Sequence, residues 1–190
     1  EYAGMERQGF HLKYELVDID HFLHTINDDF QSLAEQHKVK LSYQASPAFI
    51  NQKVTLSLDF HWCYRAIQNL LSNAMQYANN TVVISAYCQH NFLHISVEDD
   101  GKGIPEENIE NIFAPFVKLD VGRSRELGHF GLGLAISAKV VHWHNGSIHA
   151  SNILTTNDKS SVKTSKQVNK NVTITGACFT ISLPLQTEKS

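Results

Sequence analysis

Two glycine clusters and a pair of asparagines occur in a fixed order in this chain, and this order constrains the fold more than any other feature. Asn69-x-x-x-Asn73 lies in a segment with strong helical periodicity, Gly101-x-Gly103 follows an apolar run, and Gly128-x-x-Gly131-Leu132-Gly133-Leu134 comes later. Glycines at such spacing occur where a backbone bends sharply or passes close to a ligand, and turns need them as often as phosphates do. Each cluster alone is therefore compatible with a plain turn, and the evidence lies in their combination.

The spacing of apolar residues predicts alternating strands and helices. The predicted strands are residues 11–18 (an edge strand), 40–45, 54–58, 81–87, 92–98, 147–152 and 178–183, with a turn at Pro47. The predicted helices are one capped by Asp18 or Asp20 and ending near Lys38, one capped by Asp59 with Tyr77 on its buried side, a short one opened by Pro105, and one over residues 131–144. Together they predict a two-layer α+β sandwich, a mostly antiparallel mixed sheet with one face covered by three helices.

Composition limits the alternatives. A chain of 190 residues with 42% hydrophobic content can bury one full core, and a net charge of −3 gives no electrostatic case for nucleic acid. Cys63, Cys88 and Cys178 are scattered and odd in number, which argues against a disulfide framework or a zinc site and fits a reducing compartment. No signal peptide and no membrane-spanning apolar run is apparent.

One segment departs from the pattern of its neighbours. Residues 155–175 are almost wholly polar, with four lysines against a single aspartate. We interpret them as an insertion that is either disordered or an extended hairpin. A solvated surface loop is the favoured explanation of its charge, ahead of a basic docking patch.

The three clusters in this order resemble the N, G1 and G2 boxes of the ATP-binding domain shared by sensor histidine kinases, gyrase, HSP90 and MutL. Phe113-x-x-Phe116, between the glycine clusters, resembles the F box found in the histidine kinases. The resemblance extends over residues 12–184. It implies the Bergerat (GHKL) fold, with ATP and Mg²⁺ as ligands.

The resemblance assigns the purine site to the G1 box. Asp99 would accept the exocyclic amine of adenine, and a carboxylate suits this task because it can only accept while adenine offers an N–H. The backbone of Gly101, Gly103 and Ile104 would close around the purine. The alternative for this stretch is a plain acidic turn, since Asp-Gly is a common turn pair. Asp100 receives no role. Tyr77 resembles an aromatic near adenine, although a core tyrosine is the commoner outcome.

The N box bears on catalysis. Asn69 and Asn73 are one helical turn apart and share a face, and the resemblance assigns Asn73 to Mg²⁺ with Asn69 beside it. Gyrase, HSP90 and MutL carry a water-activating glutamate where this chain has Asn69. An amide cannot take a proton, which favours transfer to another nucleophile over hydrolysis. By the same resemblance, Gln76 would face the phosphates at a position where the family often has a cation.

The remaining site residues come from the G2 box and the segment before it. Residues 113–130 have no steady period and are predicted to form a mobile lid, with Phe113 and Phe116 anchoring its start. Lys118, Arg123 or Arg125 would supply the charge that Gln76 lacks. The G2 run would open a helix whose free N–H groups suit a triphosphate. Its members in the predicted site are Gly128, Gly131, Leu132, Gly133 and Leu134.

These features predict the catalytic domain of a bacterial sensor histidine kinase, and residues 97–101 and 112–120 look most like the OmpR-partnered group near RstB-type sensors. None of the eleven histidines stands in a phosphoacceptor context. We expect residues 1–10 to be the end of a dimerisation helix, 11–186 the catalytic domain and 187–190 a tail.

The resemblance further implies that the chain is the cytoplasmic portion of an inner-membrane sensor. Its expected partners are its own homodimeric phosphoacceptor domain and an OmpR-like response regulator, with no nucleic acid. Two alternatives stay open: a nucleotide-sensing module without kinase activity, and an anti-sigma-factor-type serine kinase.

Overall fold

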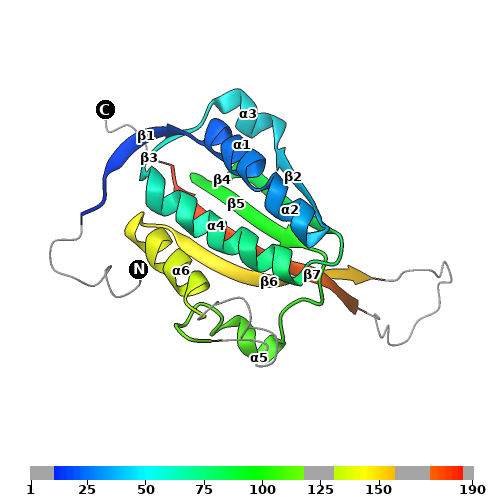
Figure 1. Ribbon diagram of the computed structural model, residues 1–190. Coiled ribbons are helices and arrows are strands. Elements are labelled where there is room, and N and C mark those ends of the chain that lie inside the picture. The colour runs from blue at the N-terminus through cyan, green and yellow to red at the C-terminus, as the bar shows by residue number, and fades with distance from the viewer. Residues whose placement is uncertain (1–10, 118–130, 157–171, 186–190) are drawn as a thin grey trace, which may run out of the picture.

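A computed structural model describes residues 11–117, 131–156 and 172–185. Figure 1 shows two layers, with helices lying across one face of a twisted sheet. The sheet has five strands in the order β2-β4-β5-β7-β6, of which only the β2–β4 pair is parallel. Its strands are β2 (Lys40–Ala45), β4 (Thr81–Gln89), β5 (Phe92–Asp99), β7 (Val172–Pro184) and β6 (Ser147–Thr156). The predicted α+β sandwich is confirmed.

Three helices form the second layer: α1 (Ile19–Asp29), α4 (Phe60–Tyr77) and α6 (Gly133–Trp143). Asp18 caps α1 through the backbone N–H of His21, and Asp59 caps α4 through that of Trp62, as aspartates do at helix starts. Each helix buries an apolar stripe on the sheet. In α4 the stripe is Cys63, Ala66, Ile67, Leu70, Leu71, Ala74 and Met75.

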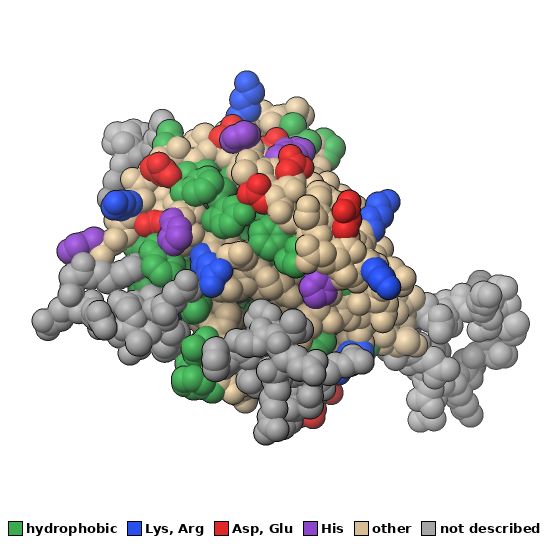
Figure 2. Space-filling model, in the orientation of Figure 1, with side chains coloured by type: hydrophobic (Ala, Val, Ile, Leu, Met, Phe, Trp, Pro, Cys, Tyr) green, Lys and Arg blue, Asp and Glu red, His purple; other side chains and the backbone are tan. Residues whose placement is uncertain are grey.

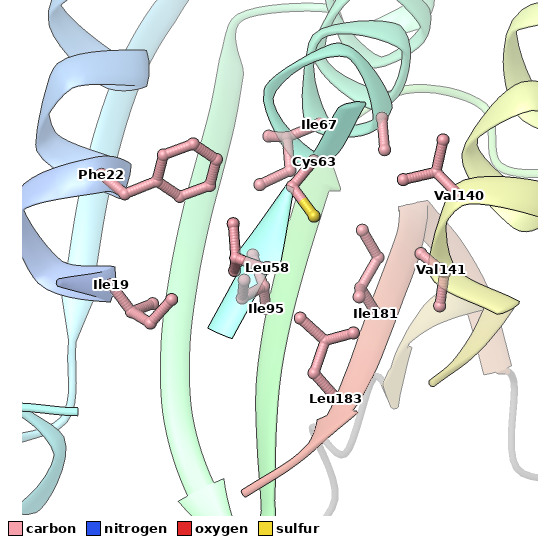
Figure 3. A pocket seen from close by; sticks show the side chains of 11 residues that line it. Ile19, Phe22, Leu58, Cys63, Ile67, Ile95, Val140, Val141, Ile181 and Leu183 are labelled. Atoms are coloured by element: carbon pink, nitrogen blue, oxygen red, sulfur yellow. The ribbon is translucent and has the colours of Figure 1, made fainter. Parts of the chain in front are cut away.

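The core between the layers contains a small cavity of about 10 Å³ (Figure 3). Side chains of α1, β3 (Thr55–Asp59), α4, β5, α6 and β7 line it, and the thiol of Cys63 lies among them. Its lining is wholly apolar, so a water molecule there would lack hydrogen-bond partners. Burial, followed by the charge of Asp59, raises the pKa of the Cys63 thiol to about 12. This cavity is a packing feature of the core.

A second, two-stranded sheet pairs β1 (Tyr14–Asp18) with β3 (Thr55–Asp59) beside the starts of α1 and α4. Buried His144 connects this sheet to the end of α6. Its Nε2 accepts the backbone N–H of Asp59 at 3.0 Å, and its Nδ1 lies 2.8 Å from the carbonyl oxygen of Val140. These contacts place the proton on Nδ1 of a neutral imidazole. The Tyr14 hydroxyl also donates to the carbonyl oxygen of Trp143 at 2.9 Å.

Two predicted elements were wrong in detail. The first helix does not run on to Lys38, because the chain leaves regular helical geometry at buried Phe30 and restarts as α2 (Gln31–His37). Pro47 does not make a simple turn. It opens α3 (Pro47–Gln52), where its missing N–H costs nothing in the first turn and Ser46 provides the cap.

The last two strands are longer than predicted. They run past residues 152 and 178 to Thr156 and Val172, with a bulge between Ile153 and Leu154. Both ends of the 155–175 segment therefore belong to a hairpin that extends beyond the sheet in Figure 1, and residues 157–171 lie outside the described part. Among the described helices, none is both long and apolar enough to cross a membrane.

Candidate functional site

Asp99 ends β5 with its side chain 3% exposed. Its Oδ1 accepts the backbone N–H of Gly101 at 2.9 Å, and the carboxylate accepts a second bond from the backbone of Ala177. Burial raises the pKa of this carboxyl, the two amide bonds oppose the rise, and the neighbouring charge of Asp100 adds to it. Two bonds leave acceptor capacity on a carboxylate. Asp99 is thus a buried acceptor held by backbone.

The loop after Asp99 is packed so closely that side chains are excluded. A Cβ on Gly101 would collide with the carbonyl oxygen of Tyr77. Gly103 has φ +76°, and a Cβ there would strike Ile174 and Asn152. The same holds on β7, where a Cβ on Gly176 would run into the carbonyl oxygen of Asp99. Tyr77, at the end of α4, is only half-buried, and the ammonium of Lys102 lies 5.8 Å from its ring centre.

The two asparagines of the predicted N box, both on α4, differ in their contacts. The Asn69 side-chain amide donates to the carbonyl oxygen of Gly133 at 3.0 Å, so Asn69 fastens α4 to the start of α6. Ser137 strengthens this junction by donating to the carbonyl oxygens of Ala66 and Gly133. Asn73, one turn further along, is half-buried, as is Gln76. In the described part of the chain neither Asn73 nor Gln76 has a side-chain hydrogen bond, which leaves both amides available to a ligand.

The G2 run enters α6 later than predicted. Gly131, at φ +69°, belongs to the turn before the helix, and α6 begins at Gly133. Leu132 is its N-cap without a side-chain cap bond, so the first N–H groups of α6 lack an intrahelical partner. Leu132 and Leu134 are partly buried and pack against the core.

The F-box prediction holds for one phenylalanine. Phe113 packs edge-on against Phe179, with ring centres 6.3 Å apart, and anchors the segment. The expectation that Phe116 also serves as an anchor was wrong, because its ring is 71% exposed. Phe116 holds position through its backbone, which has φ +68° and donates its N–H to the carbonyl oxygen of Gly131 at 2.9 Å. Lys118, Arg123, Arg125 and Gly128 lie outside the described residues.

The described surface residues carry charges of both signs. On the face shown in Figure 2, acidic and basic side chains of the described residues are interspersed. Within the described ranges there is no group of three His, Cys, Asp or Glu side chains able to hold a metal ion. A divalent cation here would need amide oxygens such as that of Asn73, together with oxygens of a ligand.

The arrangement of a helical asparagine, a carboxylate at a strand end and two glycine turns coincides with a family assignment. Residues 58–187 match the family described as histidine kinase-, DNA gyrase B- and HSP90-like ATPases. The chain belongs to this ATPase family. Within the family it is the catalytic ATPase domain of the sensor histidine kinase type, since its curated relatives include a sensor protein and a sensor histidine kinase.

The sensor protein RstB of Escherichia coli strain K12 is 34% identical over 148 residues, which cover 78% of this chain and 33% of RstB. The sensor histidine kinase WalK of Bacillus subtilis strain 168 is 30% identical over 155 residues, covering 80% of this chain and 24% of WalK. The chain thus spans about a quarter to a third of the length of these relatives.

Solved structures agree on the fold of this ATPase domain. Full-length ShkA in complex with AMPPNP superposes with a TM-score of 0.75 at 20% identity, covering all of this chain and 35% of ShkA. The catalytic domain of the histidine kinase ThkA superposes with a TM-score of 0.69 at 19% identity, covering 92% of this chain and 97% of that domain.

Sequence reasoning missed two residues that shape this ATPase site. Asp100, given no role, accepts the backbone N–H groups of Asn79, Asn80 and Thr81 at 2.8–3.0 Å and fastens the connection between α4 and β4 to the end of β5. Burial raises the pKa of Asp100, but these bonds outweigh it and the pKa is lowered. Asn152 pairs with both backbone groups of Ile104. A short polar side chain next to Gly101 was the available signal for Asp100, whereas nothing in the sequence singles out Asn152.

Proposed function

We propose that this domain binds Mg·ATP between the end of α4 and the start of α6 and delivers the γ-phosphate to a histidine of a dimerisation domain in the whole protein. The observation that carries the proposal is Asp99. It is a buried carboxylate with spare acceptor capacity, and Gly101 beside it, having no side chain, lets the loop pack directly against the end of α4. A ligand complements this group only if it offers a hydrogen-bond donor, as adenine does with its exocyclic amine.

The described residues fit such a nucleotide. Asp99 would hold the exocyclic amine of adenine, with Gly101, Gly103 and Ile104 around the ring and Tyr77 near it. Asn73 and Gln76, whose amides have no partner in the described structure, would face the phosphates together with the N–H groups at the start of α6. Mg²⁺ bound with the nucleotide supplies positive charge that offsets the phosphate oxygens, and Asn73 is the residue that would hold it.

The residues also favour transfer over hydrolysis. Asn69 is engaged with the Gly133 carbonyl and, as an amide, cannot deprotonate water. The domain would therefore position the γ-phosphate and leave the nucleophile to its partner, as phosphoryl transfer permits. Lys118, Arg123 and Arg125 are proposed to add the cations that Gln76 does not supply.

In the whole protein we propose a homodimeric sensor whose catalytic part lies on the cytoplasmic side of a membrane. A response regulator, of the OmpR-like group by the likeness of residues 97–101 and 112–120, would take the phosphoryl group from the histidine. The relatives named as sensor kinases support this setting.

The experiment is phosphorylation in trans. The chain is mixed with Mg·[γ-³²P]ATP and the dimerisation domain of its own full-length protein, and an acid-labile, base-stable phosphohistidine is expected. Asn73→Ala should abolish the product, while ATP hydrolysis by the chain alone stays near background. Brisk hydrolysis would favour a gyrase-like ATPase. Binding without transfer would favour a nucleotide-sensing module, the alternative that uncharged Gln76 suggests.

A further inference from the structure

The side chain of Asn152 on β6 holds the glycine loop that follows Asp99, although it lies two strands away from that residue. Its Oδ1 accepts the backbone N–H of Ile104 at 2.7 Å, and its Nδ2 donates to the carbonyl oxygen of Ile104 at 2.8 Å. Both bonds go to one residue, so the amide imitates the pairing of a neighbouring strand. A primary amide is suited to this because it carries a donor and an acceptor side by side.

The strand register explains why the clamp reaches the site. Asp99 on β5 pairs with Ala177 on β7, and Ala177 pairs with Asn152 on β6, so the three lie in one row across the sheet. The loop leaves β5 at Asp99, passes over β7 where Gly176 leaves room for the Asp99 carbonyl, and reaches β6 at Asn152. Both ends of the loop are therefore tied to the same row.

The residues between these ties have little freedom. Ile104 is 3% exposed and belongs to the core, and Gly103 lies against Ile174 and Asn152. With Asp99 fixed by the Gly101 and Ala177 amides, the loop backbone can keep one position before any ligand arrives. Preorganisation of this kind raises affinity because less ordering remains to be done on binding.

We propose that Asn152 is a positioning residue of the purine end of the site, and that it acts from the root of the β6–β7 hairpin through the Ile104 peptide groups. This inference rests on the proposed function. It assigns to the hairpin a share in nucleotide affinity that acts through the backbone of Ile104.

The test compares Asn152→Ala and Asn152→Asp with Thr175→Ala. Thr175 lies exposed on the same hairpin, where its hydroxyl contacts the hydroxyl of Thr155 and the carbonyl oxygen of Ile153. Removing this hydroxyl therefore perturbs the hairpin without changing a contact to the loop. Three quantities are measured for each variant: the melting temperature, the Kd values for adenosine and ADP, and the hydrogen-exchange rate of the Ile104 amide.

Asn152→Ala should weaken adenosine and ADP by the same factor, about tenfold, which corresponds to about one net hydrogen bond. It should also accelerate exchange of the Ile104 amide. Asn152→Asp should keep exchange of the Ile104 amide slow, since an acceptor for that N–H remains. It should still weaken the binding of both ligands, because the donor to the Ile104 carbonyl is gone. Thr175→Ala should leave the two Kd values and the Ile104 exchange rate unchanged.

The failures are distinguishable. If the unmodified chain binds neither ligand, the proposed function fails and this inference with it. If the unmodified chain binds both while Asn152→Ala binds equally well, only the inference is overturned. A loss in Asn152→Ala matched by Thr175→Ala at the same change in melting temperature would also overturn it, because general hairpin stability would then explain the effect.

Discussion

The purine end and the phosphate end of the proposed site differ in how their side chains and backbone are held. At the purine end, Asp99 and the loop after it are fixed by backbone amides, by Asn152 and by glycines that allow close approach. At the phosphate end, Asn73 and Gln76 have no side-chain hydrogen bond in the described structure, and the first amides of α6 have no cap. In the proposed site, the purine end is thus fixed by internal bonds, with spare acceptor capacity left on Asp99, whereas the phosphate end keeps amide and N–H groups that have no partner in the described structure.

This difference indicates that the two ends of the proposed site would recognise a ligand in different ways. A base has a fixed outline, so a rigid backbone frame with one buried acceptor discriminates it at little entropic cost on binding. Phosphates are held by charge and by many donors, and such contacts tolerate rearrangement. The following predictions test whether the division is real, from the largest expected effect to the smallest.

Gly176→Ala should be the most damaging change, because the new Cβ would strike the Asp99 carbonyl oxygen where the loop crosses β7. We expect the free energy of unfolding to fall by about 3 kcal/mol, as for an overpacked core, together with loss of nucleotide binding. Urea denaturation followed by circular dichroism measures it. The matched control is Gly133→Ala, whose Cβ would make an ordinary contact 3.5 Å from Asn69 and should leave stability within about 1 kcal/mol. Equal stability of the two variants would contradict the rigid frame.

Asp99→Asn should weaken ATP and ADP by about thirtyfold, because an amide turned toward adenine can present an N–H where an acceptor is needed. Calorimetric titration measures this, and unchanged affinity would remove the purine assignment.

The free energy of unfolding of Asp99→Asn at pH 7 should not fall below that of the unmodified chain. A carboxyl whose pKa is raised on folding stabilises the folded state while it is protonated, and this contribution is lost as the pH rises. At pH 7 the buried charge of Asp99 therefore lowers the free energy of unfolding, and replacing it by a neutral amide removes that cost. In the unmodified chain, affinity should decline as pH falls toward the raised pKa of Asp99, above its ordinary 3.8.

Asp100→Asn, unlike Asp99→Asn, should lower the free energy of unfolding at pH 7, and it should have little effect on the affinity for the purine base. The pKa of Asp100 is lowered on folding, so its contribution is present above its unfolded pKa and is lost as pH falls through the folded value. We expect a loss of about 1 kcal/mol at pH 7, since the bonds to backbone amides are charge-assisted but partly exposed. Thermal melts from pH 7 to pH 3 should show the two proteins converging at the acidic end. A constant difference over this range would show that the charge is not what matters.

Gln76→Lys should have the smallest effect and act only at the phosphate end. An added ammonium on α4 should tighten a non-hydrolysable ATP analogue about threefold, with no change for adenosine. Parallel titrations with both ligands decide it, and Gln76→Met is the uncharged control of similar length. If adenosine affinity rose equally, the two ends would not be independent.

The sequence predicted the layers and the site elements because these depend on local patterns. Apolar periodicity marked α4 and the β4–β5 hairpin, Asp59 marked a helix start, and glycine spacing marked the loops. It could not predict the break at Phe30 or the helix at Pro47, where one residue decides between similar local energies. The exposure of Phe116 was missed because two phenylalanines three residues apart look equivalent until the turn at Gly131 separates them.

Long-range polar contacts account for the rest of what was missed. Asn152 lies 48 residues from Ile104, and His144 lies 85 residues from Asp59. A single asparagine or histidine has the same appearance in a sequence whether it faces water or bonds a distant backbone. Such partners become visible only when strand register is known.

The contacts of His144 and Tyr14 have a mechanical consequence. They join the incoming strand to the places where α4 begins and α6 ends, while Asn69 and Ser137 join the same helices again nearer the glycine turn. Because α4 has 18 residues, it is a rod about 27 Å long. A tilt of about 5° imposed at its Asp59 end would move its other end, with Gln76 and Tyr77, by about 2 Å. Because α4 and α6 are joined at both ends, they would move together as one rigid unit. A change in the orientation of the chain at residues 11–13 would therefore shift the residues proposed to lie near the triphosphate.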